Sequence, residues 1–339
     1  MRRSPTLSDV ALEAGVSAAT VSRALARRRS GVPLRSDGAK RAVEAADRLG
    51  YRLNTVASAL RTRSSRLLGV IVPDLTDVAV SQMYGGFEAR AAELGYQTCV
   101  ANSTDDPRVR ASRVETFRAH GVDGIVFADA HLGEHYFSEL AADDFPYLLM
   151  SRPLPGEISV TCDDAESGRL AARHLAEQGH TDVVVLAGPS HAGNVVARSR
   201  GFADAAEGLL ESCTLVGSGF DLADAKRALA EYLERSPRPP TAVFATIDMF
   251  AFAAVSVLAE RGLRIGEEIG VIAVNDSNIA ANLPVPLTSV RHELGGMGSK
   301  AAEMLTGMIE RGPGGERPAS IALSPELVVR RSTAFRPGT

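Results

Sequence analysis

The stretch 6-TLSDVALEAGVSAATVSRAL-25 contains two short helical patterns separated by a tight turn. Thr6 and Asp9 have the spacing of a capping box, which predicts a first helix over residues 7–14. A glycine ends that pattern, and Ser17 can cap a second helix. Two helices joined by a three-residue turn must cross at a steep angle. The stretch therefore predicts helix-turn-helix geometry.

Helical periodicity indicates which residues of this stretch are buried. Val10, Ala11 and Ala14 share one face of the first helix, and Val21 and Leu25 lie four residues apart on the second. This packing leaves the other faces of the second helix free. A recognition helix presents residues at such positions to the major groove of DNA.

The free faces of the second helix carry groups suited to base and phosphate contacts. Arg23 can read guanine through paired hydrogen bonds, whereas Ala18 and Ala19 offer only methyl contacts to thymine. Three successive arginines fall at and beyond the expected helix end, where they would meet phosphates. The predicted major-groove set is Ser17, Ala18, Ala19, Thr20, Ser22 and Arg23, and the phosphate set is Thr6, Arg27, Arg28 and Arg29.

The charge of the chain is unevenly distributed. Residues 1–66 hold 14 Lys/Arg against 5 Asp/Glu, whereas residues 67–339 hold 23 against 36. The formal net charge of -4 therefore combines +9 in the first part with -13 in the remainder. A basic module on an acidic body is typical of a nucleic-acid contact confined to one end. A solvated basic face is the alternative on charge alone.

From Leu67 the pattern changes to short apolar runs that alternate with amphipathic helical stretches, as βαβ units around a parallel sheet require. We expect strands within 67–74, 97–103, 124–129 and 147–151, and a second series within 183–189, 213–219, 242–248 and 271–277. We expect helices at Met83–Leu94, Gly168–Gln178, Asp224–Glu234 and Phe250–Arg261. The fold class is thus an all-α helix-turn-helix head followed by an α/β body of two doubly wound parallel-sheet lobes.

Cysteine usage and hydropathy limit the class of protein further. Cys99, Cys162 and Cys213 are odd in number and far apart, which excludes a disulfide framework and a zinc spacing. No run approaches the roughly 18 apolar residues of a membrane span, and no secretory signal is present at the N-terminus. The sequence predicts a cytoplasmic protein with no membrane contact and no cofactor.

The head resembles that of the LacI/GalR family of bacterial transcription regulators. The similarity continues through 50-GYRLNTVASALRT-62, 70-VIVPDLTD-77, 168-GRLAARHLAEQGH-180, 198-RSRGF-202 and 324-SPELVVRRST-333. The resemblance implies a homodimeric repressor, not an enzyme, with a periplasmic-binding-protein-like body and a near-palindromic double-stranded operator. It also implies a small-molecule effector, a sugar or related metabolite, in the cleft between the lobes.

The resemblance implies the following organisation. The head spans residues 1–61, with a hinge helix at about 54–61, and residues 62–66 form a linker. The body spans 67–339, with lobe 1 at about 67–161 and 292–323 and lobe 2 at about 162–291 and 324–333. In the hinge, Leu60 would insert between base pairs in the minor groove. The predicted hinge and minor-groove residues are Asn54, Ala57, Ser58 and Leu60.

The resemblance also carries over an effector-binding set. Arg198 matches the family's anchoring arginine, which could pair with a carboxylate, a phosphate or sugar hydroxyls. Phe220 matches a stacking position, and Asn275 stands where aspartate is common in the family. The segment 74-DLTDVAV-80 lacks the aromatic residues that relatives carry there, which departs from a plain hexose pocket. The predicted effector set is Asp74, Val78, Arg152, Arg198, Phe220, Asp248 and Asn275.

Other interpretations of the chain are weaker. Residues 131-HLGEH-135 satisfy a zinc-peptidase pattern, but they follow a strand and contain a glycine, so a polar loop is favoured. Residues 295-GGMGSK-300 lack the spacing of a phosphate-binding loop and read better as a helix start. A small-molecule binding protein, either exported or with a non-functional head, remains the main alternative, because the body would serve it equally well.

Overall fold

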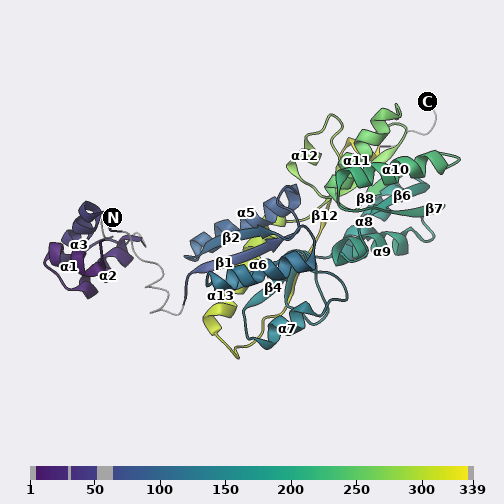
Figure 1. Ribbon diagram of the computed structural model, residues 1–339. Coiled ribbons are helices and arrows are strands. Elements are labelled where there is room, and N and C mark those ends of the chain that lie inside the picture. The colour runs from purple at the N-terminus through teal and green to yellow at the C-terminus, as the bar shows by residue number, and fades with distance from the viewer. Residues whose placement is uncertain (1–4, 30–31, 52–63, 335–339) are drawn as a thin grey trace. The chain divides into compact units, whose positions relative to one another are not determined.

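The computed structural model describes residues 5–29, 32–51 and 64–334. The chain forms two compact units, Met1–Ser65 and Arg66–Thr339. The first unit is helical and the second is an α/β body of two lobes (Figure 1). In the described part of the chain, no helix is both long enough and apolar enough to cross a membrane.

The helical unit contains α1 (Leu7–Ala14), α2 (Ala18–Arg29) and α3 (Asp37–Leu49). The capping box is present as predicted, since Thr6 Oγ1 accepts from the Asp9 amide at 3.3 Å and the Thr6 amide donates to Asp9 Oδ2 at 2.7 Å. The turn follows Gly15, whose φ of 61° is easily reached only by a residue without Cβ. The three helices enclose a core of small residues: Val10, Ala11, Ala14, Val21, Ala24, Ala39, Ala42, Ala45 and Ala46.

The second helix is longer than the sequence suggested. We expected the arginines at residues 27–29 at and beyond its end, but α2 continues through them. Arginine has a high helix propensity, which favours this extension. These positions therefore belong to the last turn of α2 rather than to a following loop.

The first lobe is built on a six-stranded sheet in the order β11-β5-β4-β3-β1-β2, with parallel pairing throughout. Its strands are β1 (Leu67–Val72), β2 (Gln97–Asn102), β3 (Gly124–Phe127), β4 (Tyr147–Met150), β5 (Ser159–Cys162) and β11 (Ile321–Leu323). Its helices are α5 (Val78–Glu93), α6 (Pro107–Ala119), α7 (Tyr136–Ala142) and α13 (Leu294–Arg311). Two apolar clusters, one on each face of the sheet, join the strands to these helices.

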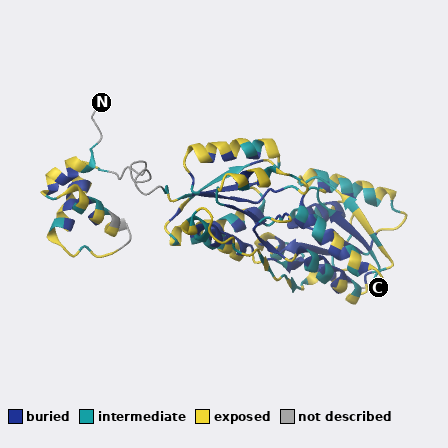
Figure 2. Cartoon of the chain, turned by 90° about the horizontal axis from the view of Figure 1, so that it is seen from below, coloured by how far each residue is buried: buried dark blue, intermediate teal, exposed yellow. Residues whose placement is uncertain are grey.

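The second lobe repeats this plan with the order β12-β10-β9-β8-β6-β7, in which only β12 is antiparallel. Its strands are β6 (Asp182–Ala187), β7 (Ser212–Gly217), β8 (Ala242–Ala245), β9 (Gly270–Asn275), β10 (Thr288–Arg291) and β12 (Glu326–Val328). Its helices are α8 (Asp164–Glu177), α9 (Gly193–Ala206), α10 (Leu222–Arg235), α11 (Asp248–Glu260), α12 (Asn278–Ala281) and the 3-10 turn η1 (Arg331–Thr333). The central strands are buried, while the helices expose their outer faces (Figure 2).

The predicted fold class is confirmed, and all eight expected strands are present, although β6, β7 and β9 each begin one residue before the expected range. Four short strands, β5, β10, β11 and β12, were not expected. In β10 the side chains of Thr288 and Ser289 are fully buried, and their hydroxyls bond backbone groups of Arg330 and Asp276. Because these buried positions carry hydroxyl groups that hydrogen bonds satisfy, the strand does not form an apolar run in the sequence.

The chain passes between the lobes three times, after β5, after β10 and after β11. The connections are short, and residues on them lie where the lobes meet. His292, on the second connection, donates or accepts a hydrogen bond at 2.8 Å with Ser167 Oγ of α8. The carboxyl ends of strands from both sheets converge in this region, which is where open α/β sheets bind ligands.

Candidate functional site

The first candidate site is the outer face of α2. Ser17, Ala18, Ala19 and Arg23 are exposed, whereas Val21 on the opposite face is fully buried. The Ser17 hydroxyl caps the helix by accepting from the Thr20 amide at 3.2 Å. Thr20 and Ser22 are half-buried at the edges of this face. The exposed face of α2 therefore carries polar side chains next to the methyl groups of alanines, a combination suited to contact with base edges.

The groups predicted to contact phosphates have different surroundings. Arg27 is exposed, and Arg28 donates from Nη1 to both carboxylate oxygens of Asp47 in α3, at 2.7 and 2.8 Å. The Thr6 hydroxyl is held in the capping box, where it donates to Asp9 Oδ2 at 2.7 Å. The side chain of Arg29 and the hinge set, Asn54, Ala57, Ser58 and Leu60, lie outside the described residues.

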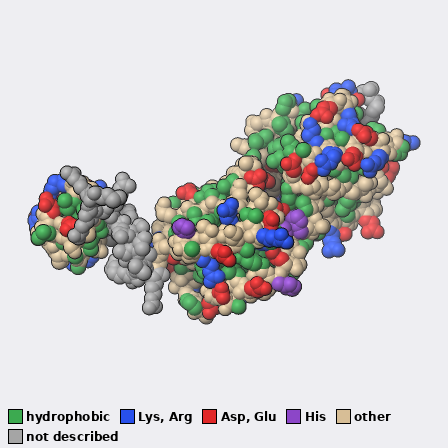
Figure 3. Space-filling model, in the orientation of Figure 1, with side chains coloured by type: hydrophobic (Ala, Val, Ile, Leu, Met, Phe, Trp, Pro, Cys, Tyr) green, Lys and Arg blue, Asp and Glu red, His purple; other side chains and the backbone are tan. Residues whose placement is uncertain are grey.

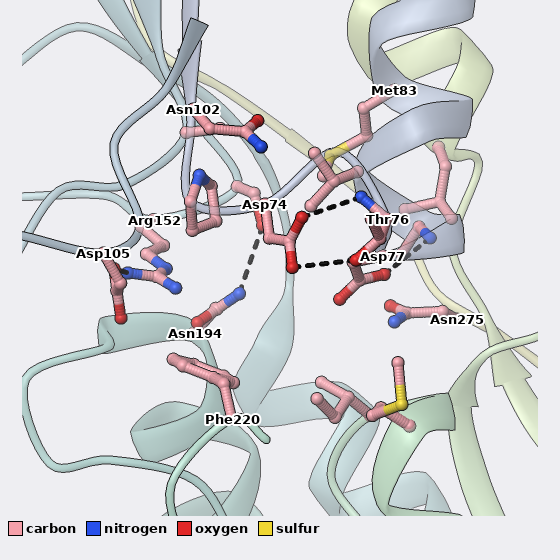
Figure 4. A pocket seen from close by; sticks show the side chains of 18 of the residues that line it. Asp74, Thr76, Asp77, Met83, Asn102, Asp105, Arg152, Asn194, Phe220 and Asn275 are labelled. Atoms are coloured by element: carbon pink, nitrogen blue, oxygen red, sulfur yellow. Dashed lines mark hydrogen bonds and ion pairs between the residues drawn. The ribbon is translucent and has the colours of Figure 1, made fainter. Parts of the chain in front are cut away.

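The second candidate site is a cavity of about 370 Å³ in the body, between the two lobes. Its volume falls in the range of small-molecule sites. Apolar walls are formed by Val80, Met83, Phe220, Ile247, Met249 and Leu294. Polar groups also line it from both lobes, most of them after strand ends and Asn194 and Arg198 on α9: Asp74, Thr76, Asp77, Asn102, Thr104, Asp105, Ser151, Arg152, Asn194, Arg198, Asp221 and Asn275 (Figure 4).

Backbone strain is concentrated at this cavity. Thr104, Asp105, Ser151 and Asn275 all line it and have φ values of 55°, 56°, 68° and 106°. Residues with Cβ reach such angles only when the surrounding structure holds them there. Each of these residues follows or ends a strand, so the strain fixes the direction of its side chain at the cavity edge.

Arg198 lines the cavity but is already paired within the protein. Its Nε donates to Asp164 Oδ1 at 2.8 Å and its Nη1 to the Thr246 carbonyl at 2.8 Å. Its Nη2 lies 3.4 Å from His292 Nδ1. Burial lowers the pKa of His292 well below its usual value, with a further contribution from the charge of Arg198, so the imidazole is neutral. The predicted anchoring arginine is therefore neutralised by Asp164.

Arg152 is likewise paired. Its Nη1 donates to Asp105 Oδ1 at 2.6 Å, and its guanidinium lies 4.9 Å from the centre of the Phe220 ring. Burial raises the pKa of Asp105, but Arg152, His191 and His131 outweigh that effect, so the pKa lies below its usual value. Figure 4 shows the Arg152 side chain pointing toward Asp105. Phe220, which the family resemblance assigns to a stacking position, lines the cavity.

Asp74 and Asp77 of the first lobe, in contrast, have no cationic partner among the ion pairs of the described residues. Asp74 accepts from the amide and hydroxyl of Thr76 at 2.9 and 2.8 Å, and Asp77 caps α5 by accepting from the Ala79 amide at 2.8 Å. Burial raises the pKa of Asp77, and the nearby charge of Asp74 adds to this effect. The polar lining therefore has carboxylates in excess.

Two predicted effector residues do not line the cavity. Val78, the first residue of α5, lies beside lining residues but is not among them. Asp248, at the start of α11, is buried and accepts from the Ser277 amide at 2.8 Å. A side chain at a helix start can turn back to bond a neighbouring loop, and this is what Asp248 does. The other five residues of the predicted set, Asp74, Arg152, Arg198, Phe220 and Asn275, do line it.

Several lining residues were missed in the sequence. Asn102 lies near the end of an expected strand and Thr104 and Asp105 follow it, and polar residues at that position are the signal that could have identified them. Asn194 lies one helical turn before Arg198 on α9, and its Nδ2 donates to Ser151 Oγ of the first lobe at 3.1 Å. Only the folded chain shows that this pair joins the two lobes.

The catalytic patterns weighed in the sequence do not form catalytic sites. Glu134 of the segment 131–135 pairs with the buried Arg110, and His135 is exposed at the start of α7. Residues 295–300 lie inside α13, which begins at Leu294, so they form the helix start that was expected.

Comparisons with known proteins agree with this geometry. Residues 6–54 match the family described as bacterial regulatory proteins, lacI family, and residues 172–333 match a periplasmic binding protein-like domain. The chain is 30% identical to the HTH-type transcriptional regulator DegA of Bacillus subtilis (strain 168), over 97% of this chain and 98% of that one. The lac repressor dimer bound to operator and the anti-inducer ONPF has the same fold, with a TM-score of 0.84, 23% identity and 98% and 99% coverage. The complex of the transcriptional regulator CelR with cellobiose has a TM-score of 0.72, with 27% identity and 97% and 99% coverage.

A helix-turn-helix unit joined to a two-lobed periplasmic-binding-protein-like body defines a DNA-binding transcription regulator rather than an enzyme. The chain belongs to the LacI family of bacterial regulatory proteins, as the sequence resemblance predicted.

Proposed function

We propose that this chain is a homodimeric, effector-responsive repressor that acts in the cytoplasm on a near-palindromic operator. The observation that carries the proposal is the combination, in one chain, of a basic unit with an exposed recognition face on α2 and a body with a cavity at its strand ends. A two-fold protein suits an operator with two related half-sites. A dimer seated on promoter DNA would exclude polymerase from the same site.

In this proposal each α2 enters the major groove. Arg23 is exposed, and within the described residues it donates a 3.3 Å bond from Nε to the Ala19 carbonyl of its own helix, which it can exchange for a guanine edge. Ala18 and Ala19 offer methyl groups to thymine. Asn54, Ala57, Ser58 and Leu60 would form the hinge contacts in the minor groove.

The charges of the cavity favour an effector that is neutral and rich in hydroxyls, or one that carries an amine. Arg152 and Arg198 are the basic residues among its lining, and each already holds a carboxylate. Asp74 and Asp77 can accept hydrogen bonds from hydroxyl or ammonium groups. An anionic effector would have to share an arginine whose charge a carboxylate already neutralises, and it would lie near Asp74 and Asp77, which is unfavourable. The effector is therefore a polyol or an amino sugar rather than a sugar phosphate or a carboxylic acid.

The first test is selection of binding sites from random duplex DNA with the purified full-length protein at moderate salt. An enriched palindrome with a flexible central pyrimidine-purine step would support the recognition by α2, the hinge helix and the dimer together. Polyols, amino sugars and sugar phosphates would then be screened for a change in affinity for that site. No enriched site with or without the screened compounds would contradict the repressor proposal, and release by sugar phosphates alone would contradict the charge argument.

A further inference from the structure

A cluster of metal-binding side chains lies at the edge of the cavity and draws on both lobes. His131 Nε2 lies 3.2 Å from Asp105 Oδ1, and His191 Nε2 lies 2.8 Å from Asp105 Oδ2. Asp105 and His131 follow β2 and β3 of the first lobe, whereas His191 follows β6 of the second. Within residues 5–29, 32–51 and 64–334, these three form a group whose ligand atoms all lie within 4.8 Å of one another.

The ligand types and distances match those of a zinc-type ion. Two imidazoles and a carboxylate are a common three-residue set for Zn²⁺, with bonds of about 2.0–2.2 Å. In a tetrahedral site these bonds place two ligand atoms about 3.3 Å apart. The distance of 3.2 Å from His131 to Asp105 Oδ1 lies close to that value, and the distance of 2.8 Å from His191 to Asp105 Oδ2 is shorter. Imidazole nitrogens also make Ca²⁺ and Mg²⁺ poor candidates, because those ions select oxygen ligands.

The surrounding structure holds the three side chains in this arrangement. The backbone of Asp105 is fixed at a φ of 56°, and Arg152 donates to its Oδ1 at 2.6 Å. Supporting hydrogen bonds of this kind orient the carboxylates that bind metals. The imidazoles of His131 and His191 stack with ring centres 4.0 Å apart. The Leu132 amide also donates to the His191 carbonyl at 2.7 Å, which ties the two loops together across the lobe boundary.

The charged groups around the three candidate ligands do not prevent a cation from binding there. Arg152 is one positive group at the cluster, and Arg110 is a second, close behind it. Asp105, Asp129 and Glu134 bring three carboxyl groups to the same region. All three candidate ligands are partly exposed, so an ion can reach them from solvent.

We propose that Asp105, His131 and His191 bind one zinc-type divalent ion that joins the two lobes at the edge of the effector cavity. Three protein ligands leave a fourth coordination position for water or for a donor atom of a molecule in the cavity. Because the ligands come from both lobes, the ion binds most tightly when the lobes are arranged as they are here. Metal binding thus stabilises this arrangement. The proposal stands apart from DNA binding and is tested without it.

The test is metal titration of the full-length protein, purified without a histidine tag, treated with EDTA and transferred to metal-free buffer. Co²⁺ binding is followed by its visible absorption, and Zn²⁺ affinity by competition with a chromogenic chelator. The variants are His131→Gln and His191→Gln, because glutamine can still donate a hydrogen bond to Asp105 but is a poor ligand. His135→Gln is the matched control, since His135 is exposed on the same segment and lies outside the cluster.

We expect one ion per chain in the wild type and in His135→Gln, and a loss of affinity of more than about tenfold in each of the other two variants. Zn²⁺ should also raise the melting temperature of the wild type and of His135→Gln but not of His191→Gln. Circular dichroism establishes that each variant is folded. The proposal is overturned if the wild type binds no ion, if binding is weak and equal in all variants, or if His135→Gln loses as much as His191→Gln. Any of these results would leave the cluster as a hydrogen-bonded contact between the lobes only.

Discussion

Among single residues, Asp248 is an unfavourably placed carboxyl of the body. It is 5% exposed, its Oδ2 accepts from the Ser277 amide, and its Oδ1 has no hydrogen-bond partner among the described residues. Burial raises its pKa from the ordinary value of 3.8 to about 6. At neutral pH the folded protein therefore holds a buried charge without a cationic partner, which destabilises the fold.

Asp248→Asn should make the body more stable at pH 8 than the wild type. The folded-state pKa lies above the unfolded value, so the folded protein binds the extra proton between about pH 4 and pH 6, and the wild type loses stability as the pH rises through that window. Above pH 6 the penalty is complete, at most about 3 kcal/mol for a shift of two pKa units. Urea unfolding at pH 8, 6 and 4.5 measures the effect. A difference between variant and wild type that stays constant with pH would contradict this account.

The pair formed by Arg28 and Asp47 bears on DNA contact. Both side chains are at least half exposed, at 50% and 60%, so the ion pair adds little to stability. It does, however, hold Arg28 against α3. An arginine that is paired with a carboxylate is less available to a phosphate.

Asp47→Asn should therefore raise the affinity for duplex DNA several-fold, with little loss of stability, because it releases Arg28. Asp37→Asn is the matched control: it removes the same charge from the first turn of α3, where the partner is Lys40 at 3.6 Å. Fluorescence anisotropy with labelled DNA at two salt concentrations compares them. Equal gains in both variants would assign the effect to net charge and not to Arg28.

At the scale of elements, the packing of α5 on α13 sets the wall of the cavity. Val80 and Met83 of α5 and Leu294 of α13 line it. The two helices approach closely because Gly86 and Gly298 lack side chains: a Cβ on Gly86 would lie 2.1 Å from the Gly295 carbonyl oxygen. Backbone atoms cannot yield to such a contact, so the helices would have to separate.

Gly86→Ala should destabilise the body by about 1–3 kcal/mol, as overpacking does, and weaken effector binding because the wall moves. Gly85→Ala, one residue earlier in the same helix, meets no atom within 4 Å and should be neutral or stabilising by up to about 1 kcal/mol. Denaturant unfolding of the two variants gives the comparison. Similar stabilities for both would show that the close helix contact is not required.

At the scale of the whole molecule, charge is divided between the two units. The acidic and basic side chains of the body are interspersed on the face shown in Figure 3. The first 66 residues carry a net charge of +9 and the remainder -13. The acidic body repels DNA, so contact is directed to the head, and the affinity of the head depends on salt.

If the protein is a dimer with the arginines at residues 27–29 of each protomer on phosphates, log Kd should rise with log salt concentration with a slope of about 5, at roughly 0.9 per contact. A monomer would give about half that slope. Anisotropy titrations from low to moderate salt measure it, and sedimentation equilibrium at the same protein concentrations gives the oligomeric state. A slope below about 2 would contradict phosphate contact by this arginine run.

The sequence by itself determined the helix-turn-helix and the alternation of strands and helices in the body. These features depend on local patterns: the capping box of Thr6 and Asp9, the spacing of Val10 and Ala14, and short apolar runs followed by amphipathic helices. Phe220 was identified from the family resemblance, and Asn275 also from its place at the end of an expected strand, since the ends of parallel strands meet at one edge of a sheet.

Only the tertiary structure decided which charges are neutralised and which groups meet across the lobes. Arg198 pairs with Asp164, 34 positions away, and Asp105 meets His191, 86 positions away. No local pattern encodes such pairs, because they depend on three crossings of the chain between two sheets and on helices brought close by glycine. Whether two charged groups pair depends on their separation in the folded chain and not on their separation in the sequence. The excess of carboxylates in the cavity and the candidate metal site are therefore properties of the folded chain.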